Sequence, residues 1–121
     1  MHWCYFCYAV NRHSSGPCVR CGRPVEGPPG LSFDDWLVWT LGHPDGDRAV
    51  LAAQTLGARR VESAVPALRR AVEEDRDPYL AVEALRSAIA IAGCDQLRDW
   101  LEQLADSESF MVREVAQRAL V

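Results

Sequence analysis

Apolar residues recur every three or four positions through most of residues 32–121, a spacing that places them on one face of an α-helix. Two such stripes are Val61, Val65, Leu68 and Val72, and Leu97, Leu101 and Leu104. Glycine, proline and polar residues separate the periodic segments and indicate where helices begin and end. The pattern predicts six helices, at residues 32–41, 46–57, 62–74, 77–91, 94–105 and 109–120.

The predicted helices superimpose when the sequence is shifted by 32 residues. Equivalent positions then carry the same kind of residue, as in two sets of three: Ala52, Ala84 and Ala116, and Trp36, Leu68 and Trp100. A fixed period in this range is typical of stacked helical hairpins, which bury their apolar faces only against their neighbours. We therefore predict an all-α fold, a short solenoid of about six helices over residues 32–121.

Three phrases in this array resemble HEAT repeats of the short bacterial kind related to phycobilin lyases. They are Asp-Arg-Ala-Val-Leu-Ala-Ala-Gln-Thr-Leu-Gly at 47–57, Ala-Val-Pro-Ala-Leu at 64–68 and Met-Val-Arg-Glu-Val-Ala-Gln-Arg-Ala-Leu at 111–120. The resemblance implies a HEAT solenoid. Members of that family that hydroxylate their substrates use paired His-Glu ligands, whereas the helical part here has the single histidine His43, which we expect at the surface in a turn before Pro44. We therefore expect no enzyme activity.

The segment before the helices divides into a short unit and a linker. Six of the nine residues from 22 to 30 are Gly or Pro, a composition that breaks helices and strands. We assign residues 23–31 as a linker and residues 1–22 as a separate unit. A unit this short is unable to bury a sufficient apolar core and needs another source of stability.

Four of the five cysteines lie in that unit, as two Cys-x2-Cys pairs separated by ten residues. Two such pairs supply a tetrahedral thiolate shell, so we predict structural Zn²⁺ bound by Cys4, Cys7, Cys18 and Cys21. Disulfides would require an exported protein, a thioredoxin-type pair would require a strand–helix turn, and iron is a less favoured occupant of the same ligands. The fifth cysteine, Cys94, is expected to be a buried apolar thiol.

The letters around the cysteines resemble the Ran-binding-protein type of zinc finger, a small zinc ribbon: Trp3-Cys4-x2-Cys7-x3-Asn11-x6-Cys18-x2-Cys21-Gly22. The unit has one residue fewer between the tryptophan and the first cysteine than that family. RNA-binding members have an aromatic residue and then arginines after the asparagine, whereas Arg12 and His13 follow here. Ubiquitin-binding members have Thr-Phe after the second cysteine, where this chain has Tyr8 and Ala9. The resemblance implies the zinc scaffold without either binding activity.

Charge differs between the two parts of the chain. The whole sequence has a formal net charge of −4, but residues 1–30 have three Arg and one Glu, while residues 31–121 have ten Arg and sixteen acidic residues. The helical part is therefore a poor nucleic-acid binder, because a phosphate backbone requires a basic surface. A nucleic-acid role, if present, would use the ribbon through Arg12, Arg20 and Arg23. No apolar run is long enough to span a membrane and no leader opens the chain, so we expect a cytoplasmic protein.

Four aromatic residues lie in or beside the first cysteine pair: Trp3, Tyr5, Phe6 and Tyr8. They could form a platform on which bases stack, or they could pack the ribbon onto the helices. We favour packing onto the helices. By the 32-residue register the helix at 32–41 has no helical partner before it, yet it carries Trp36 and Trp39. We predict that the ribbon packs on these tryptophans and caps the array.

We interpret the chain as a small adaptor whose helical array binds another protein. The predicted partner-facing rows, on the second helix of each hairpin, contain Leu37, Arg69, Arg70, Leu101 and Glu102. At the C-terminal end the last helix has no polar capping helix behind it, so Met111, Val115 and Leu120 favour self-association or partner docking there.

Overall fold

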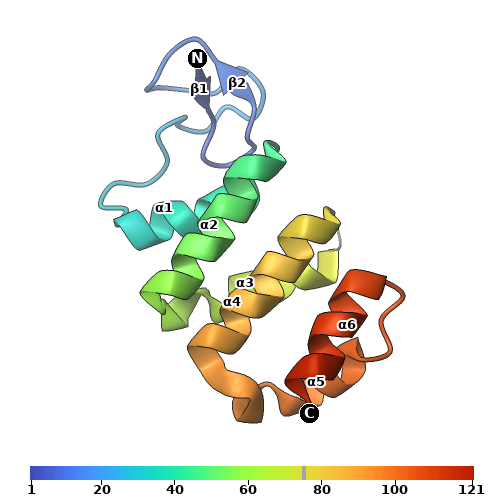
Figure 1. Ribbon diagram of the computed structural model, residues 1–121. Coiled ribbons are helices and arrows are strands. Elements are labelled where there is room, and N and C mark those ends of the chain that lie inside the picture. Colours follow the sequence, from blue (N-terminus) through green and yellow to red (C-terminus); the bar gives the residue numbers. More distant parts are fainter. Residues whose placement is uncertain (75) are drawn as a thin grey trace.

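Six α-helices follow residue 32 in the computed structural model, which describes residues 1–74 and 76–121 (Figure 1). They are α1 (Phe33–Thr40), α2 (Gly46–Arg59), α3 (Val65–Glu74, preceded by the 3-10 turn Glu62–Ala64), α4 (Pro78–Gln96), α5 (Arg98–Leu104) and α6 (Phe110–Ala119). The predicted all-α array is confirmed. In the part of the chain that the structure describes, no helix is both long and apolar enough to cross a membrane.

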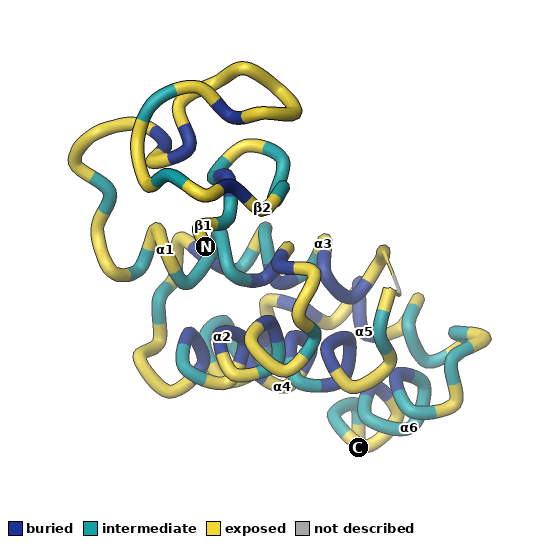
Figure 2. The backbone as a smooth tube through the Cα atoms, turned by 90° about the horizontal axis from the view of Figure 1, so that it is seen from above, coloured by how far each residue is buried: buried dark blue, intermediate teal, exposed yellow. Residues whose placement is uncertain are grey.

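The helices form two layers. α2, α4 and α6 lie side by side in one layer, and α1, α3 and α5 lie behind them in the other (Figures 1 and 2). Each helix of the second layer packs on one of the first: α1 on α2, α3 on α4, and α5 on α6. This is the arrangement that a 32-residue helical repeat predicts.

Small residues allow the helices of the first layer to approach closely. The repeated alanines Ala52, Ala84 and Ala116 are all buried. At Gly57 of α2 an added Cβ would lie 2.5 Å from the Oγ of Ser87 in α4, and this hydroxyl donates a hydrogen bond to the Ala53 carbonyl at 2.6 Å. The contact between α2 and α4 therefore depends on residues that have almost no side chain.

Side chains that accept hydrogen bonds from the backbone start most of these helices. Ser32 and Asp35 form a reciprocal capping box at α1, while Asp45, Asp77 and Ser109 cap α2, α4 and α6. Predicted boundaries fall within a few residues of those observed, except between α4 and α5. There α4 continues to Gln96 across Gly93, whose φ of 83° is not helical.

The N-terminal ribbon contains a short antiparallel pair, β1 (His2–Trp3) and β2 (Val10–Asn11). The predicted linker at 23–31 begins too early, because residues 23–27 pack with the ribbon. Val25 is buried against the cysteines, and its carbonyl accepts a hydrogen bond from the Tyr5 N–H at 3.0 Å. Gly27, with φ of 74°, lies against the Tyr5 side chain, where an added Cβ would be 2.6 Å from Cγ.

Candidate metal centre and docking interface

The structure brings the four predicted ligands together. The sulfurs of Cys4 and Cys21 are 3.7 Å apart, those of Cys7 and Cys18 are 3.6 Å apart, and all four lie within 4.8 Å of one another. A tetrahedral shell with zinc–sulfur bonds of about 2.3 Å separates its sulfurs by about 3.8 Å. The geometry therefore fits a four-thiolate metal site, and the separations exceed the S–S bond of a disulfide, about 2.05 Å.

The two cysteine pairs have the same backbone turn. The N–H of Tyr8 donates to the Cys4 carbonyl at 2.9 Å, and the N–H of Gly22 donates to the Cys18 carbonyl at 3.0 Å. Both donors have left-handed backbone conformations, with φ of 61° at Tyr8 and 76° at Gly22. A residue with a side chain is less stable in this conformation by roughly 1–2 kcal/mol, so contacts of the Tyr8 side chain must offset that cost.

N–H groups directed at Cys18 favour its thiolate form. The backbone of Cys21, the backbone N–H of Arg20 and the amide of buried Asn11 all lower the pKa of the Cys18 thiol, to about 6. The Arg20 N–H lies 3.3 Å from this sulfur and the Asn11 Nδ2 lies 3.4 Å from it. Asn11 is held in place because its Oδ1 accepts a hydrogen bond from the Val19 N–H at 2.9 Å.

The four thiols are too close to ionise together without a cation. At Cys7 the backbone of Ala9 lowers the pKa, but desolvation and the three neighbouring thiols outweigh it and raise the pKa to about 11. A divalent cation would remove this conflict, because it binds all four sulfurs as thiolates. The cluster can therefore hold a metal ion. Cys94 lies apart from it, half-buried against the core of the array where a buried thiol was expected.

The ribbon packs on the tryptophans of α1, as predicted. The Trp39 ring stacks on the ring of Tyr8, with centroids 4.9 Å apart, and lies parallel to that of Tyr5 at 6.2 Å. The Trp39 Nε1–H donates to the Tyr5 carbonyl and the Tyr8 hydroxyl donates to the Trp39 carbonyl, both at 2.6 Å. Trp36 meets Tyr5 edge-on at 5.7 Å. Tyr8 thus holds a left-handed conformation in which its side chain joins the two parts of the protein.

His43 is buried in this interface, with 1% of its surface exposed, so the expectation that it lies at the surface is wrong. Its ring lies 4.5 Å from that of Trp3 and 5.5 Å from that of Trp39. Nδ1 accepts a hydrogen bond from the Asp45 N–H at 2.9 Å, while Nε2 has no partner among the described residues. Burial, and then the charge of Arg48, lower the pKa of His43. A turn before proline is usually exposed, but here the ribbon covers it.

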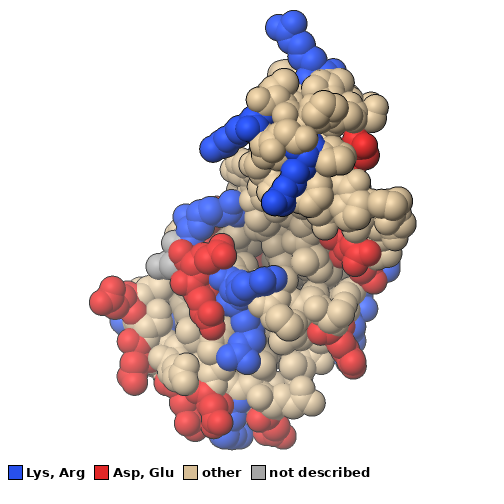
Figure 3. All heavy atoms as spheres, turned by 180° about the vertical axis from the view of Figure 1, so that it is seen from behind, with Lys and Arg blue, Asp and Glu red and all other residues tan. Residues whose placement is uncertain are grey.

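One aromatic residue of the ribbon faces outward. Phe6 is 40% exposed, and the guanidinium of Arg23 lies over its ring at 5.1 Å. The other three aromatic residues of the first cysteine pair contact α1 or His43. Arg12 and Arg20 are also exposed, but on the face in Figure 3 uncharged surface separates the basic side chains of the ribbon. The ribbon therefore offers a single aromatic ring with separate charges, not a stacking platform.

The residues predicted to face a partner are not on a common exposed surface. Leu101 is fully buried, so its predicted outward orientation is wrong, and Leu37 is half-buried against the same core. The reason is that Leu101 belongs to the buried stripe of α5 that begins at Leu97. Arg69 is half-buried, with its guanidinium 4.7 Å from the centre of the Trp100 ring. The exposed members of the set are Arg70 and Glu102.

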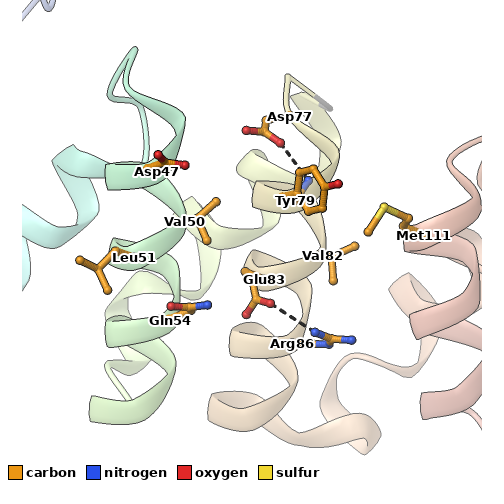
Figure 4. A pocket seen from close by; sticks show the side chains of 10 residues that line it. All are labelled: Asp47, Val50, Leu51, Gln54, Asp77, Tyr79, Val82, Glu83, Arg86 and Met111. Atoms are coloured by element: carbon orange, nitrogen blue, oxygen red, sulfur yellow. Dashed lines mark hydrogen bonds and ion pairs between the residues drawn. The ribbon is translucent and has the colours of Figure 1, made fainter.

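A large hollow lies on the opposite layer, across α2, α4 and α6 (Figure 4). It has a volume of about 460 Å³. Sequence reasoning missed this surface, on which the large apolar residues Leu51 and Tyr79 are exposed. At the C-terminal end Met111, Val115 and Leu120 are half-buried, the last two against the core, and self-association there stays a prediction.

Residues 35–121 match the family model for HEAT repeats. The match begins within α1 and extends to the last residue, so it covers nearly the whole array. No curated protein and no solved structure matches the chain. Residues 1–34 lie outside the match, so the resemblance of the ribbon to the Ran-binding-protein type of zinc finger also stays a prediction.

Proposed function

Because the chain belongs to the HEAT-repeat family, we propose that it is an adaptor that binds another protein through its helical array. HEAT repeats generally mediate protein–protein interactions. The observation that carries the proposal is the interface between the ribbon and α1. Tyr5 and Tyr8 contact Trp39 inside the molecule, so the ribbon acts as a cap and the surfaces of the array remain for a partner.

The proposed metal is zinc, in a structural role. Four thiolates form a closed shell without an open position for a substrate, the arrangement typical of structural zinc. The ribbon needs this metal because its own buried core is small: Cys4, Cys18 and Val25. A reducing compartment keeps such thiols available, so we also propose a cytoplasmic location. Elemental analysis of the purified protein tests the metal, with one zinc per chain expected and iron in place of zinc as the contrary result.

The proposed role is binding and not catalysis. Three charged side chains of the large hollow already have partners: the Arg86 guanidinium lies 3.2 Å from the Glu83 carboxylate, and Asp77 accepts a hydrogen bond from the Tyr79 N–H. Groups occupied in this way are poor candidates for the acid, base or nucleophile of a reaction.

A second candidate function, nucleic-acid binding by the ribbon, rests on exposed Phe6 and the nearby basic residues. Phe6 offers one ring for a base, and Arg12, Arg20 and Arg23 would contact phosphates. One face of that ring is already covered by Arg23. We therefore favour the protein adaptor.

Capture with chemical cross-linking separates the two functions. The full chain, loaded with zinc and immobilised, is exposed to an extract of the cells that make it, and cross-linked peptides are identified by mass spectrometry. The adaptor predicts proteins cross-linked to residues 33–121. In parallel, a labelled single strand is titrated at low salt against the protein and against an Arg12→Ala/Arg20→Ala variant. Salt-sensitive binding that the variant loses, without proteins cross-linked to the array, would contradict the adaptor function.

A further inference from the structure

The outer surface of α2, α4 and α6 contains one continuous groove. Its larger hollow, of about 460 Å³, lies over α2 and α4 and reaches Met111 of α6. A second hollow of about 310 Å³ lies between α4 and α6 and shares Val82, Arg86 and Met111 with the first. In Figure 4 Val50 points from α2 toward α4, and Met111 points from α6 toward Val82. The groove therefore crosses all three helices of this layer.

Its walls expose large apolar side chains. Leu51 is 63% exposed and Tyr79 is 66% exposed, on α2 and α4 respectively. Half-buried Val50 and Met111 and the buried Val82 continue this apolar surface along the groove. A concave surface that exposes several large apolar groups is typical of a site that another molecule covers.

The charge of the groove is unequal along its length. The larger hollow has three carboxylates and one guanidinium, a formal charge of −2: Asp47, Asp77, Glu83 and Arg86. Arg86 is paired with Glu83 at 3.2 Å, and in the second hollow Arg118 is paired with Glu114 at 2.6 Å. The excess negative charge therefore lies at the end where α2 and α4 begin, with Asp47 and Asp77 (Figure 4).

We propose that this groove binds a segment of a partner protein that has apolar side chains and at least one Lys or Arg. The apolar side chains cover Leu51, Tyr79 and Met111, and the basic side chain lies against Asp47 and Asp77. The charge complementarity selects this occupant, because an anionic ligand such as nucleic acid would be repelled at that end. The inference rests on the proposed adaptor function and places the contact on the layer opposite to the one predicted from sequence.

The test selects peptides that bind the full chain from a random peptide display library. The enriched peptides are then synthesised, and their binding to the protein is measured. We expect enriched peptides to combine Lys or Arg with apolar residues. Asp47→Asn/Asp77→Asn removes two charges while asparagine keeps the cap of α4, and we expect binding at low salt to weaken by about tenfold. Leu51→Glu, at an exposed position, should weaken it by about tenfold or more. Circular dichroism verifies that each variant is folded.

A matched control removes two charges from the other layer, in Glu73→Gln/Glu102→Gln, and should change binding by less than about twofold. Peptides without basic residues, or peptides that lose affinity only in this control, would overturn the inference. Proteins cross-linked to the array together with peptides indifferent to the groove variants would leave the adaptor function standing but not this site. A dimer in light scattering that Leu51→Glu dissociates would assign the groove to a second copy of the chain and also overturn it.

Discussion

The ribbon and the helical array are stabilised by different means. The ribbon has strands of two residues each and a buried apolar cluster of Cys4, Cys18 and Val25. The array buries a continuous core from α1 to α6, in which side chains such as Leu56 and Leu85 are completely covered. The proposed metal ion would therefore stabilise the ribbon, whereas the array depends on the packing of apolar residues.

Between them lies an interface of a third kind, made of aromatic rings and short hydrogen bonds. Trp39 contacts Tyr5 and Tyr8 of the ribbon through both its ring and its backbone. Since the two regions have separate sources of stability, a change in one should leave the other folded and should weaken this interface in an observable way.

Loss of the metal should have the largest effect. Removal by a chelator, or Cys7→Ser, should unfold residues 1–27, because structural zinc supplies on the order of 10–16 kcal/mol to the folding of small zinc units. Amide hydrogen exchange measures this residue by residue, and protection should be lost in the ribbon and retained in α2 to α6.

Cys94→Ser provides the control, since this cysteine lies outside the cluster. It should retain the metal and the protection of the ribbon. A ribbon that stays protected without metal would show that its small apolar cluster suffices, and the contrast between the two regions would disappear.

The helices could be predicted because their signals are local. Apolar spacing and capping residues such as Ser32 and Asp77 lie within or beside the elements that they specify. The four cysteines of the candidate metal site could also be predicted, since two Cys-x2-Cys pairs are typical of a four-thiolate site. Tertiary contacts were harder: Val25 lies in a Gly/Pro-rich run that was assigned as linker, but the same glycines allow the tight turn that returns Val25 to the ribbon.

The errors at His43 and Leu101 have different causes, and the first is contact between segments far apart in the sequence. His43 is buried because Trp3 and Tyr8 cover it, about forty positions away, and no pattern around His43 indicates this. Leu101 was assigned outward because it lies two repeat periods after Leu37. Its own stripe with Leu97 was the better guide, because both leucines are buried in the core of the array.

Leu101→Ala should give the next largest effect and test the array by itself. Leu101 is fully buried, so the variant should lower the free energy of unfolding of the array by about 2–5 kcal/mol. Leu37→Ala, at the equivalent but half-buried position, should cost roughly half as much or less. Chemical denaturation followed by circular dichroism measures both. Equal losses would indicate that the two leucines are equally buried, contrary to the structure.

Tyr8→Phe should have a smaller effect, confined to the interface. It keeps the ring that stacks on Trp39 but removes the hydroxyl that donates to the Trp39 carbonyl at 2.6 Å. The expected cost is about 1 kcal/mol, the typical net value of one hydrogen bond. It is measured as faster exchange of the Trp39 Nε1–H, which the ribbon protects through the Tyr5 carbonyl. Tyr79→Phe, at an exposed ring on α4, is the matched control and should leave this exchange unchanged.

The pH dependence of the interface should be the smallest effect, and it depends on His43. Burial lowers the pKa of this imidazole below its ordinary value of 6.5, with a further lowering by Arg48 and Arg76 and an opposing contribution from Asp45. The separated state therefore binds more protons than the docked state, so docking is fully stable above about pH 6.5 and weakens as the pH falls toward the lowered pKa. The protonated ring would also place a proton on Nδ1, which now accepts the hydrogen bond from the Asp45 N–H.

His43→Gln should flatten the pH profile of Trp39 Nε1–H exchange, whereas His13→Gln, in the ribbon and facing the Pro17 carbonyl, should not. Acid release of the metal affects all three proteins alike, so the difference between the profiles isolates His43, and identical profiles would exclude it as the titrating group.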